Sequence, residues 1–170
     1  SGIGKSTLLS ILMGLEKADE GTVSGMEHQK ISVIFQENRL FENLDAVTNI
    51  HITTGKTKEE ITGFLKKMEL DDIAGKPVSE YSGGMKRRVA IARALLAEYD
   101  ILIMDEPTNH LDMESITALN NGLIKFPGVV LFTSQDHQFI QTIANRIMEI
   151  TPGGLIDKIS TYDEYLDSDE

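Results

Sequence analysis

The chain has no cysteine and only four histidines among its 170 residues. Without cysteine, neither a disulfide framework nor a thiolate metal site can form, and the redox compartment is left open. The histidines are scattered along the chain and do not indicate a metal site. The length and the 41% share of hydrophobic residues are typical of one globular domain with a core of its own.

Positive charge and long apolar runs are also scarce. The formal net charge of -11 at pH 7 would repel a nucleic-acid backbone, so we expect no DNA partner. Apolar runs such as residues 129–132 are far shorter than the roughly 20 residues of a membrane-spanning helix. Residues 1–5 lack the basic start and apolar stretch of a signal peptide and look like an interior cut. These features favour a cytoplasmic location, with any membrane role carried by a partner at the inner face.

Helical and strand patterns alternate along the chain. Residues 5–13 are typical of a helix opened by a glycine loop, and short apolar runs at 31–35, 101–104 and 129–133 are typical of buried strands. Helical spacing recurs from Ile116 to Phe126 and from Phe139 to Ile147, and Pro152, Gly153 and Gly154 lie where a terminal hairpin or a strand change is expected. The alternation predicts an α/β fold with a mainly parallel sheet.

Residues between the first two strands have helical character. Thr57 and Glu60 form a capping box, and Ile61, Phe64, Leu65 and Met68 recur on one helical face. Ser82, Gly83 and Gly84 open a further helix. The basic run Lys86, Arg87 and Arg88 on that helix is predicted to be a solvated face rather than an RNA contact.

The start of the chain matches the end of the phosphate-binding pattern G-x-x-x-x-G-K-[ST], whose first glycine would precede Ser1. Lys5 would reach the β- and γ-phosphates, and the Ser6 hydroxyl would ligate Mg²⁺. Backbone amides would cradle the phosphates along the loop, which comprises Gly2, Ile3, Gly4, Lys5, Ser6 and Thr7. The alternative is a glycine-rich helix start followed by a surface lysine.

Two acidic residues directly follow the apolar run at 101–104. The carboxyl end of a parallel strand is where a phosphate-binding NTPase carries carboxylates. Asp105 would hold Mg²⁺ through water, and Glu106 would act as general base on the attacking water. The alternative is a pair of solvated acids at the start of a loop.

The order and spacing of these motifs resemble the ATP-binding cassette proteins. The resemblance rests on residues 1–7, Gln36 after a strand, residues 81–85, and residues 101–112. It implies a P-loop NTPase core, at 1–36 and about 89–170, interrupted by a helical subdomain at about 37–88. It also implies that the first strands of one partial domain are missing.

The same resemblance implies further roles. Gln36 would contact Mg²⁺ and the attacking water. Ser82, Gly83 and Gly84 look like the signature sequence that contacts ATP held by an opposite subunit, and Asp112 belongs to the loop that crosses the dimer interface. A second ABC ATPase domain, ATP and Mg²⁺ are therefore the implied partner and cofactors.

Gln135 stands where the family carries its switch histidine. Its amide can donate a hydrogen bond to a γ-phosphate but cannot carry a proton, so a slow ATPase is expected. His137, two residues on, is predicted to be a surface residue of the next helix.

The two parts of the chain resemble different subfamilies. Residues 36–104 are similar to bacterial importer-type cassettes, which work with a membrane permease, whereas residues 105–166 are similar to ABC-F proteins, which act on the ribosome. A recombinant, a fusion or a mis-assembled reading frame would explain the change. We expect ATP hydrolysis that powers transport through a permease; the alternatives are an ABC-F ATPase acting in translation and a nucleotide-binding regulatory or dimerisation module with little hydrolysis.

Overall fold

The computed structural model describes residues 4–35, 37–109 and 111–168. Its elements follow one another in the order α1 (Lys5–Leu12), β1 (Ile31–Ile34), α2 (Ala46–Thr54), α3 (Lys58–Lys67), η1 (Asp71–Ile73), η2 (Val78–Glu80), α4 (Gly83–Leu96), β2 (Ile101–Asp105), α5 (Met113–Ile124), β3 (Val129–Thr133), α6 (His137–Ile143), β4 (Ile147–Thr151), β5 (Gly154–Lys158) and α7 (Tyr162–Asp167). The three predicted strands and the helix at the start of the chain are confirmed.

The central sheet has the order β1-β2-β3 with both pairs parallel, as predicted. The middle strand β2 buries Leu102, Ile103 and Met104 because both of its faces are covered, which explains its uninterrupted apolar run. Asp105 at the end of β2 pairs in register with Thr133 at the end of β3. Residues that follow the strands therefore gather at one edge of the sheet.

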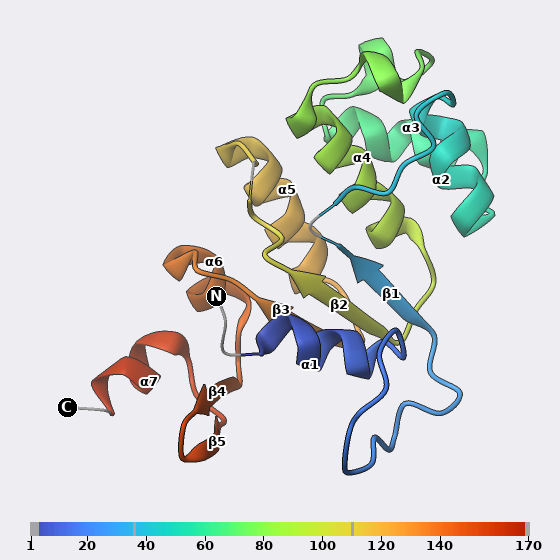
Figure 1. The fold of residues 1–170 in the computed structure, drawn as a ribbon. Helices are drawn as coiled ribbons and strands as arrows, with labels where there is room; N and C mark the ends of the chain where they lie inside the picture. The colour runs from blue at the N-terminus through green and yellow to red at the C-terminus, as the bar shows by residue number, and fades with distance from the viewer. Residues whose placement is uncertain (1–3, 36, 110, 169–170) are drawn as a thin grey trace.

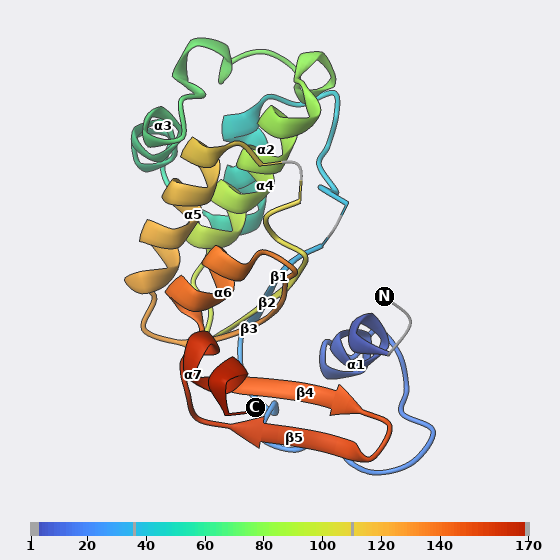
Figure 2. The ribbon, with the colours of Figure 1, turned by 90° about the vertical axis from the view of Figure 1, so that its left-hand side faces the viewer.

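Helices lie on both faces of this sheet. α4 packs on β1, and α5 contacts both α4 and α6, whereas α1 contacts β2. Figure 2 shows the sheet nearly edge-on, with α5 and α6 on one side and α1 on the other. The arrangement is the layered α/β architecture of a P-loop NTPase core.

A helical layer, which we define as residues 46–96, lies above the sheet in Figure 1. The predicted capping box forms: the Thr57 side chain accepts from the Glu60 amide, and the Glu60 carboxylate accepts from the Thr57 amide. Ile61 and Leu65 on the predicted apolar face are fully buried. α4 runs without interruption through residue 88, so the subdomain boundary that we expect there falls inside a helix.

The sequence analysis did not find α2. This helix contains β-branched residues at most positions, which favour strands over helices. Its stability comes from tertiary contacts, since α2 packs on α3 and α4 and buries Ile50 completely. The buried Asn49 side chain accepts from the Phe41 amide at 2.8 Å and donates to the carbonyls of Phe41 and Asp45 at 3.0 Å, which ties the helix to the preceding loop.

The C-terminal part contains the expected hairpin, formed by β4 and β5 in antiparallel register. The expected helix from Phe139 to Ile147 is too long: α6 ends at Ile143, and Ile147 begins β4 instead. The backbone of α6 leaves the helical region at Ala144, whose amide donates the last hydrogen bond of the helix to the Ile140 carbonyl. α7 follows β5 and packs on α6. None of the helices in the described ranges is both long and apolar enough to cross a membrane.

Candidate active site

The first turn of α1 presents backbone amides at the edge of the sheet. Gly4 adopts φ +88°, a left-handed conformation that favours glycine, and its carbonyl accepts from the Leu8 amide at 2.9 Å. Among the described residues, no side chain caps this helix start. Its free amides and dipole end therefore suit an anion. Lys5 is half-buried in the first turn, whereas Ser6 and Thr7 are exposed; Gly2 and Ile3 lie outside the described residues.

Ser6 and Asp105 meet across 99 residues of sequence. The Ser6 hydroxyl donates to Asp105 Oδ2 at 2.9 Å, and the Thr133 hydroxyl donates to Asp105 Oδ1 at 2.5 Å. α1, β2 and β3 thus each supply one member of a small polar cluster. The sequence predicted Ser6 and Asp105 as metal-binding residues, and their side chains are in contact; Thr133 was not predicted.

Glu106 follows Asp105 in an unusual backbone conformation. Its φ of +46° is in the left-handed region, which non-glycine residues rarely adopt. Its amide donates to the Thr133 carbonyl at 3.1 Å and to the Thr133 hydroxyl at 3.2 Å. Strained residues of this kind occur preferentially at functional sites, and the two contacts with β3 hold Glu106 in place.

The donor set fits Mg²⁺ bound together with phosphates. Mg²⁺ prefers oxygen ligands and is usually held by one or two carboxylates plus substrate phosphates. Asp105 and Ser6 supply one carboxylate and one hydroxyl beside an uncapped helix start. No cluster of three or more metal-ligating side chains occurs within the described ranges, so phosphate oxygens would complete the coordination.

Arg87 is a residue whose importance the sequence analysis missed. The prediction of a solvated face is wrong for it, because Arg87 is only 3% exposed. Its guanidinium donates to the carbonyl of Phe35 and to the carbonyls of Glu106 and Pro107, at 3.4 and 3.2 Å. Burial lowers the pKa of Arg87 from its ordinary value. Arg87 therefore connects α4 with the end of β1 and with the turn after β2.

The neighbouring basic residue also points inward. Arg88 donates to the Met68 carbonyl at 3.1 Å and pairs with the Asp112 carboxylate at 3.2 Å. The residue types alone could not reveal that Arg87 and Arg88 are buried or partly buried, because charged residues on a helix are mostly exposed to solvent. The signal available in the sequence was helical spacing: Arg87 lies four residues before Ile91, and Arg88 lies four residues before Ala92, both apolar positions of α4.

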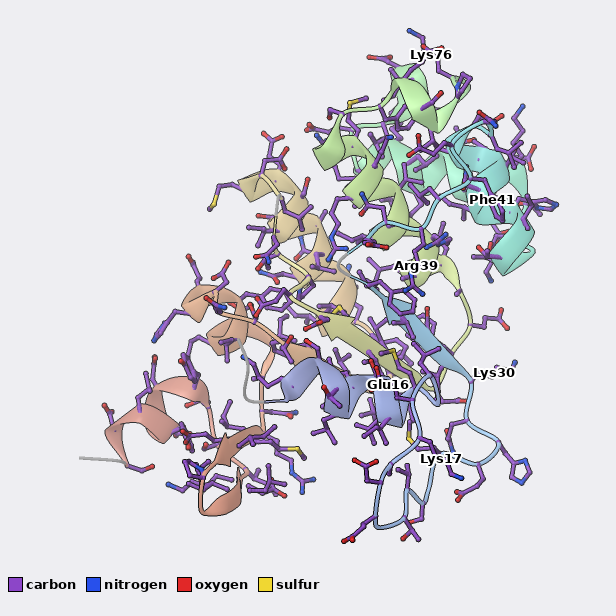
Figure 3. All side chains as sticks on the ribbon, in the orientation of Figure 1. Glu16, Lys17, Lys30, Arg39, Phe41 and Lys76 are labelled. Carbon is purple, nitrogen blue, oxygen red and sulfur yellow. The ribbon has the colours of Figure 1, made fainter. Side chains whose placement is uncertain are left out.

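The segment after β1 is held by a second arginine. Arg93 donates to the Asn38 carbonyl at 3.1 Å and to the Arg39 carbonyl at 2.8 Å, and the Arg39 guanidinium lies 3.6 Å from the centre of the Phe35 ring. Figure 3 shows Arg39 where the end of β1 meets the helical layer. Gln36, predicted to bind Mg²⁺ and water, lies outside the described residues.

The predicted signature residues lie at the start of α4. The Ser82 hydroxyl accepts from the Met85 amide at 3.3 Å, which makes Ser82 the N-cap, and both Ser82 and Gly83 are exposed. In Figures 1 and 2 this end of α4 lies away from α1. The structure therefore does not bring Ser82, Gly83 and Gly84 together with Lys5 and Ser6.

Asp112 has a structural role in this chain. Its carboxylate accepts from the Ser115 amide at 2.9 Å and from the Ser115 hydroxyl at 2.5 Å, so it caps α5. The hydrogen bond from the Ser115 hydroxyl is the main reason that the pKa of Asp112 is lowered. The predicted role of Asp112, in a loop that crosses a dimer interface to bound nucleotide, would have to coexist with these bonds.

Gln135 lies two residues beyond Thr133, at the same sheet edge as Asp105, and is exposed. The prediction for His137 is confirmed: it is an exposed residue that begins α6. Its ring nitrogen lies 3.9 Å from the Asp163 carboxylate, and its ring centre lies 4.8 Å from that of Tyr162, with the two planes tilted by 59°. Among the described site residues, Ser6, Asp105 and Glu106 therefore lie together, and Gln135 follows the strand that holds them.

Comparison with known sequences gives a consistent result. A family model described as ABC transporter matches residues 1–109. The chain is 44% identical over 169 residues to the uncharacterized ABC transporter ATP-binding protein YkpA of Bacillus subtilis, covering 96% of this chain and 31% of that protein. It is 34% identical to ABC transporter F family member 2 of Arabidopsis thaliana, covering 98% of this chain and 25% of that protein. The chain thus spans about a third or less of these relatives.

Solved structures share the fold. The ATP binding subunit of an ABC transporter superposes with a TM-score of 0.82 at 22% identity, over 99% of this chain and 78% of that one. The archaeal ribosome recycling factor aABCE1, in complex with the ribosomal stalk protein aP1, superposes with a TM-score of 0.76 at 27% identity, over 99% of this chain and 35% of that one. With the family match, the P-loop fold and the motif order, these findings show that the chain belongs to the ABC transporter family of ATP-binding cassette proteins.

Proposed function

We propose that this chain binds Mg-ATP and hydrolyses it to ADP and phosphate. The observation that carries the proposal is the contact between the Ser6 hydroxyl and the Asp105 carboxylate, beside the uncapped start of α1. A hydroxyl at a helix start and a carboxylate at a strand end are what a P-loop NTPase uses for Mg²⁺. Family membership supports the same chemistry.

Some residues of the site bind the charged triphosphate and Mg²⁺, and another accepts a proton. Lys5 and the amides of the first α1 turn bind the triphosphate, while Ser6 and Asp105 hold Mg²⁺. When bound, Mg²⁺ supplies a Lewis acid that neutralises charge on the phosphate oxygens. Glu106, in its strained conformation, accepts the proton of the attacking water.

A second cassette completes the site in this proposal. Ser82, Gly83 and Gly84 offer a serine hydroxyl and glycine amides at the start of a 14-residue helix, which suits a phosphate. Their separation from α1 in Figure 1 supports a contact with nucleotide bound by another domain rather than by this one. Gln135 in place of a histidine would make turnover slow, since an amide cannot carry a proton.

Phosphate release by the full-length gene product tests the ATPase proposal. Asp105→Asn should reduce the rate at saturating ATP by about 100-fold or more, because the amide is a far poorer Mg²⁺ ligand. Asp157→Asn is the matched control, since Asp157 pairs with Arg146 on the hairpin. An Asp105 variant that hydrolyses ATP as fast as the control would overturn the assignment.

For the wider role, we infer that an ABC-F ATPase acting on the ribosome is favoured over a transport ATPase. The match with the F family member runs through 98% of the chain, including the part that resembles importer-type cassettes. A ribosome recycling factor is also among the structures that share the fold. Transport through a membrane permease is the competing role, which the family's description supports.

Fractionation of cells that carry the Glu106→Gln variant separates these roles. The variant should bind ATP without hydrolysing it and should therefore stay bound to its partner, because we expect release to follow conversion of ATP to ADP. Co-sedimentation of the variant with ribosomes in Mg-ATP, and its loss when ADP replaces ATP, supports the ribosomal role. Recovery with membranes, dependent on one permease gene, would support transport instead.

A further inference from the structure

The Thr133 hydroxyl contacts both acidic residues that follow β2. It donates to Asp105 Oδ1 at 2.5 Å and accepts from the Glu106 amide at 3.2 Å. A hydroxyl can do both at once, because it has one proton to donate and lone pairs that accept. Valine, which has the same shape, can do neither.

The contact follows from strand register. β3 carries apolar residues at its first four positions and threonine only at its last, where it pairs with Asp105. The side chain of a strand-end threonine therefore meets the carboxylate of the neighbouring strand end. The backbone bond from the Glu106 amide to the Thr133 carbonyl, at 3.1 Å, belongs to the same strand pair and does not need the side chain.

Asp105 is held differently at its two oxygens. Oδ1 accepts from Thr133 on β3, and Oδ2 accepts from Ser6, which is exposed at the start of α1. Ser6 is itself a proposed Mg²⁺ ligand, so its hydroxyl has a second use. The Thr133 hydroxyl is not among the proposed Mg²⁺ ligands, so it could keep Oδ1 in place whether or not the metal is bound.

We propose that Thr133 is a positioning residue, which orients the Asp105 carboxylate for Mg²⁺ and anchors the strained Glu106 backbone beside it. This inference rests on the proposed ATPase function. Thr133 is also the last residue of β3 and lies two residues before Gln135, which follows the strand.

The first test measures Mg²⁺ dependence without turnover. In the full-length Glu106→Gln protein, binding of a fluorescent ribose-labelled ATP is followed while Mg²⁺ is varied. Adding Thr133→Val should raise the Mg²⁺ concentration for half-maximal binding by about tenfold, in keeping with the loss of a hydrogen bond to a charged group. Binding of the labelled ATP in EDTA should not change. Equal Mg²⁺ dependence with and without the Thr133 hydroxyl would overturn the inference.

The second test measures turnover and rescue. Thr133→Val should lower kcat by about tenfold or more while the KM for Mg-ATP at saturating Mg²⁺ changes by less than about threefold. Thr133→Ser restores the hydroxyl and should recover most of kcat. If serine and valine are equally impaired, the methyl group rather than the hydroxyl matters, and the inference is wrong.

Controls separate positioning from folding. Thr142→Val removes a hydroxyl that donates to the Gln138 carbonyl at 2.7 Å on α6, and should leave Mg²⁺ dependence and kcat unchanged. Thr133→Ala is a second hydroxyl-free variant, for use if the valine protein melts early. A wild-type protein that neither binds nor hydrolyses Mg-ATP would overturn the proposed function as well; a normal wild type with silent Thr133 variants would overturn only this inference.

Discussion

The helical layer and the elements around α1 are packed to different degrees. In the layer, Ile50, Ile61 and Val78 are fully buried. Outside the layer, Leu8 of α1 is 42% exposed, Val129 of β3 is 62% exposed, and Leu155 of β5 is 59% exposed. Burial of apolar surface is the main source of folding stability. The comparison teaches that α1, which begins the proposed phosphate site, and the hairpin are less tightly packed, whereas one core extends from the helical layer through β2.

Charge follows the same division. The helical layer, residues 46–96, carries six acidic and nine basic side chains, so the rest of the chain has a formal charge of -14. An acidic surround disfavours free ATP, which makes the few positive groups at the phosphate site important. Removing the charge of Lys5 is therefore the first test of the comparison.

Lys5→Ala should have the largest effect. It removes the cation that faces the triphosphate, so binding of Mg-ATP should weaken by about 100-fold or more, the loss expected for a charge-assisted hydrogen bond in an acidic surround. Binding is measured by titration of labelled ATP. Lys17→Ala, in the exposed loop after α1 (Figure 3), should bind as the wild type does. Unchanged affinity in the Lys5 variant would mean that α1 is not the phosphate-binding helix.

Arg87→Met should have the next largest effect, because Arg87 joins the two regions. The buried carbonyls of Phe35 and Pro107 would lose their donor, at a cost on the order of 3 kcal/mol in the free energy of unfolding. Arg146→Met is the control: its ion pair with Asp157 is exposed and should contribute less than about 1 kcal/mol. Urea unfolding measures both. Equal free energies of unfolding for the Arg87 and Arg146 variants would show that the buried guanidinium does not stabilise the contact between the helical layer and the sheet.

Hydrogen exchange should sharpen the comparison without any substitution. Amides of α2, α3 and α4 should exchange at least about tenfold more slowly than those of α1 and of the β4–β5 hairpin. The reason is that local opening of these three helices would expose more buried apolar surface than opening of α1 or the hairpin. Mass spectrometry of peptic peptides resolves the two groups. Adding Mg-ATP should slow exchange mainly in α1. Uniform exchange across both regions would contradict the difference in packing.

Gln135→His should have the smallest effect. A histidine at this position can transfer a proton, so turnover at saturating ATP should rise by up to about tenfold while ATP affinity changes little. Gln138→His, three residues on and also exposed, is the matched control. Phosphate release is measured for each variant, and the rate of the Glu106→Gln protein is subtracted as the background. A rate equal to or below that of the wild type would mean that Gln135 is not the switch residue, or that another step limits turnover.

Sequence reasoning predicted those elements whose signal is local. The strands β1, β2 and β3 are short apolar runs, and the Thr57 capping box begins α3 as expected. α2 escaped because its β-branched residues oppose a helix, which only its packing and the buried Asn49 make stable. Ile147 was assigned to a helix because apolar spacing alone does not reveal where the backbone leaves the helical region.

The site divides in the same way. Ser6, Asp105 and Glu106 follow from motifs, because the chemistry requires those residue types in that order. Thr133 and Arg87 do not, since each acts on residues that are far away in the sequence and near only in the fold. A threonine at the end of an apolar strand and an arginine on a helix carry no local sign of such contacts.

The most direct test of the account is the Glu106→Gln variant of the full-length protein. The amide keeps the shape of the side chain but cannot accept the proton of the attacking water. We expect phosphate release to fall by about 100-fold or more while the affinity for Mg-ATP stays within about threefold, with Glu16→Gln, in the exposed segment after α1, as an unaffected control. Hydrolysis at the wild-type rate in the Glu106 variant would contradict the assignment of Glu106 as general base and, with it, the proposed active site.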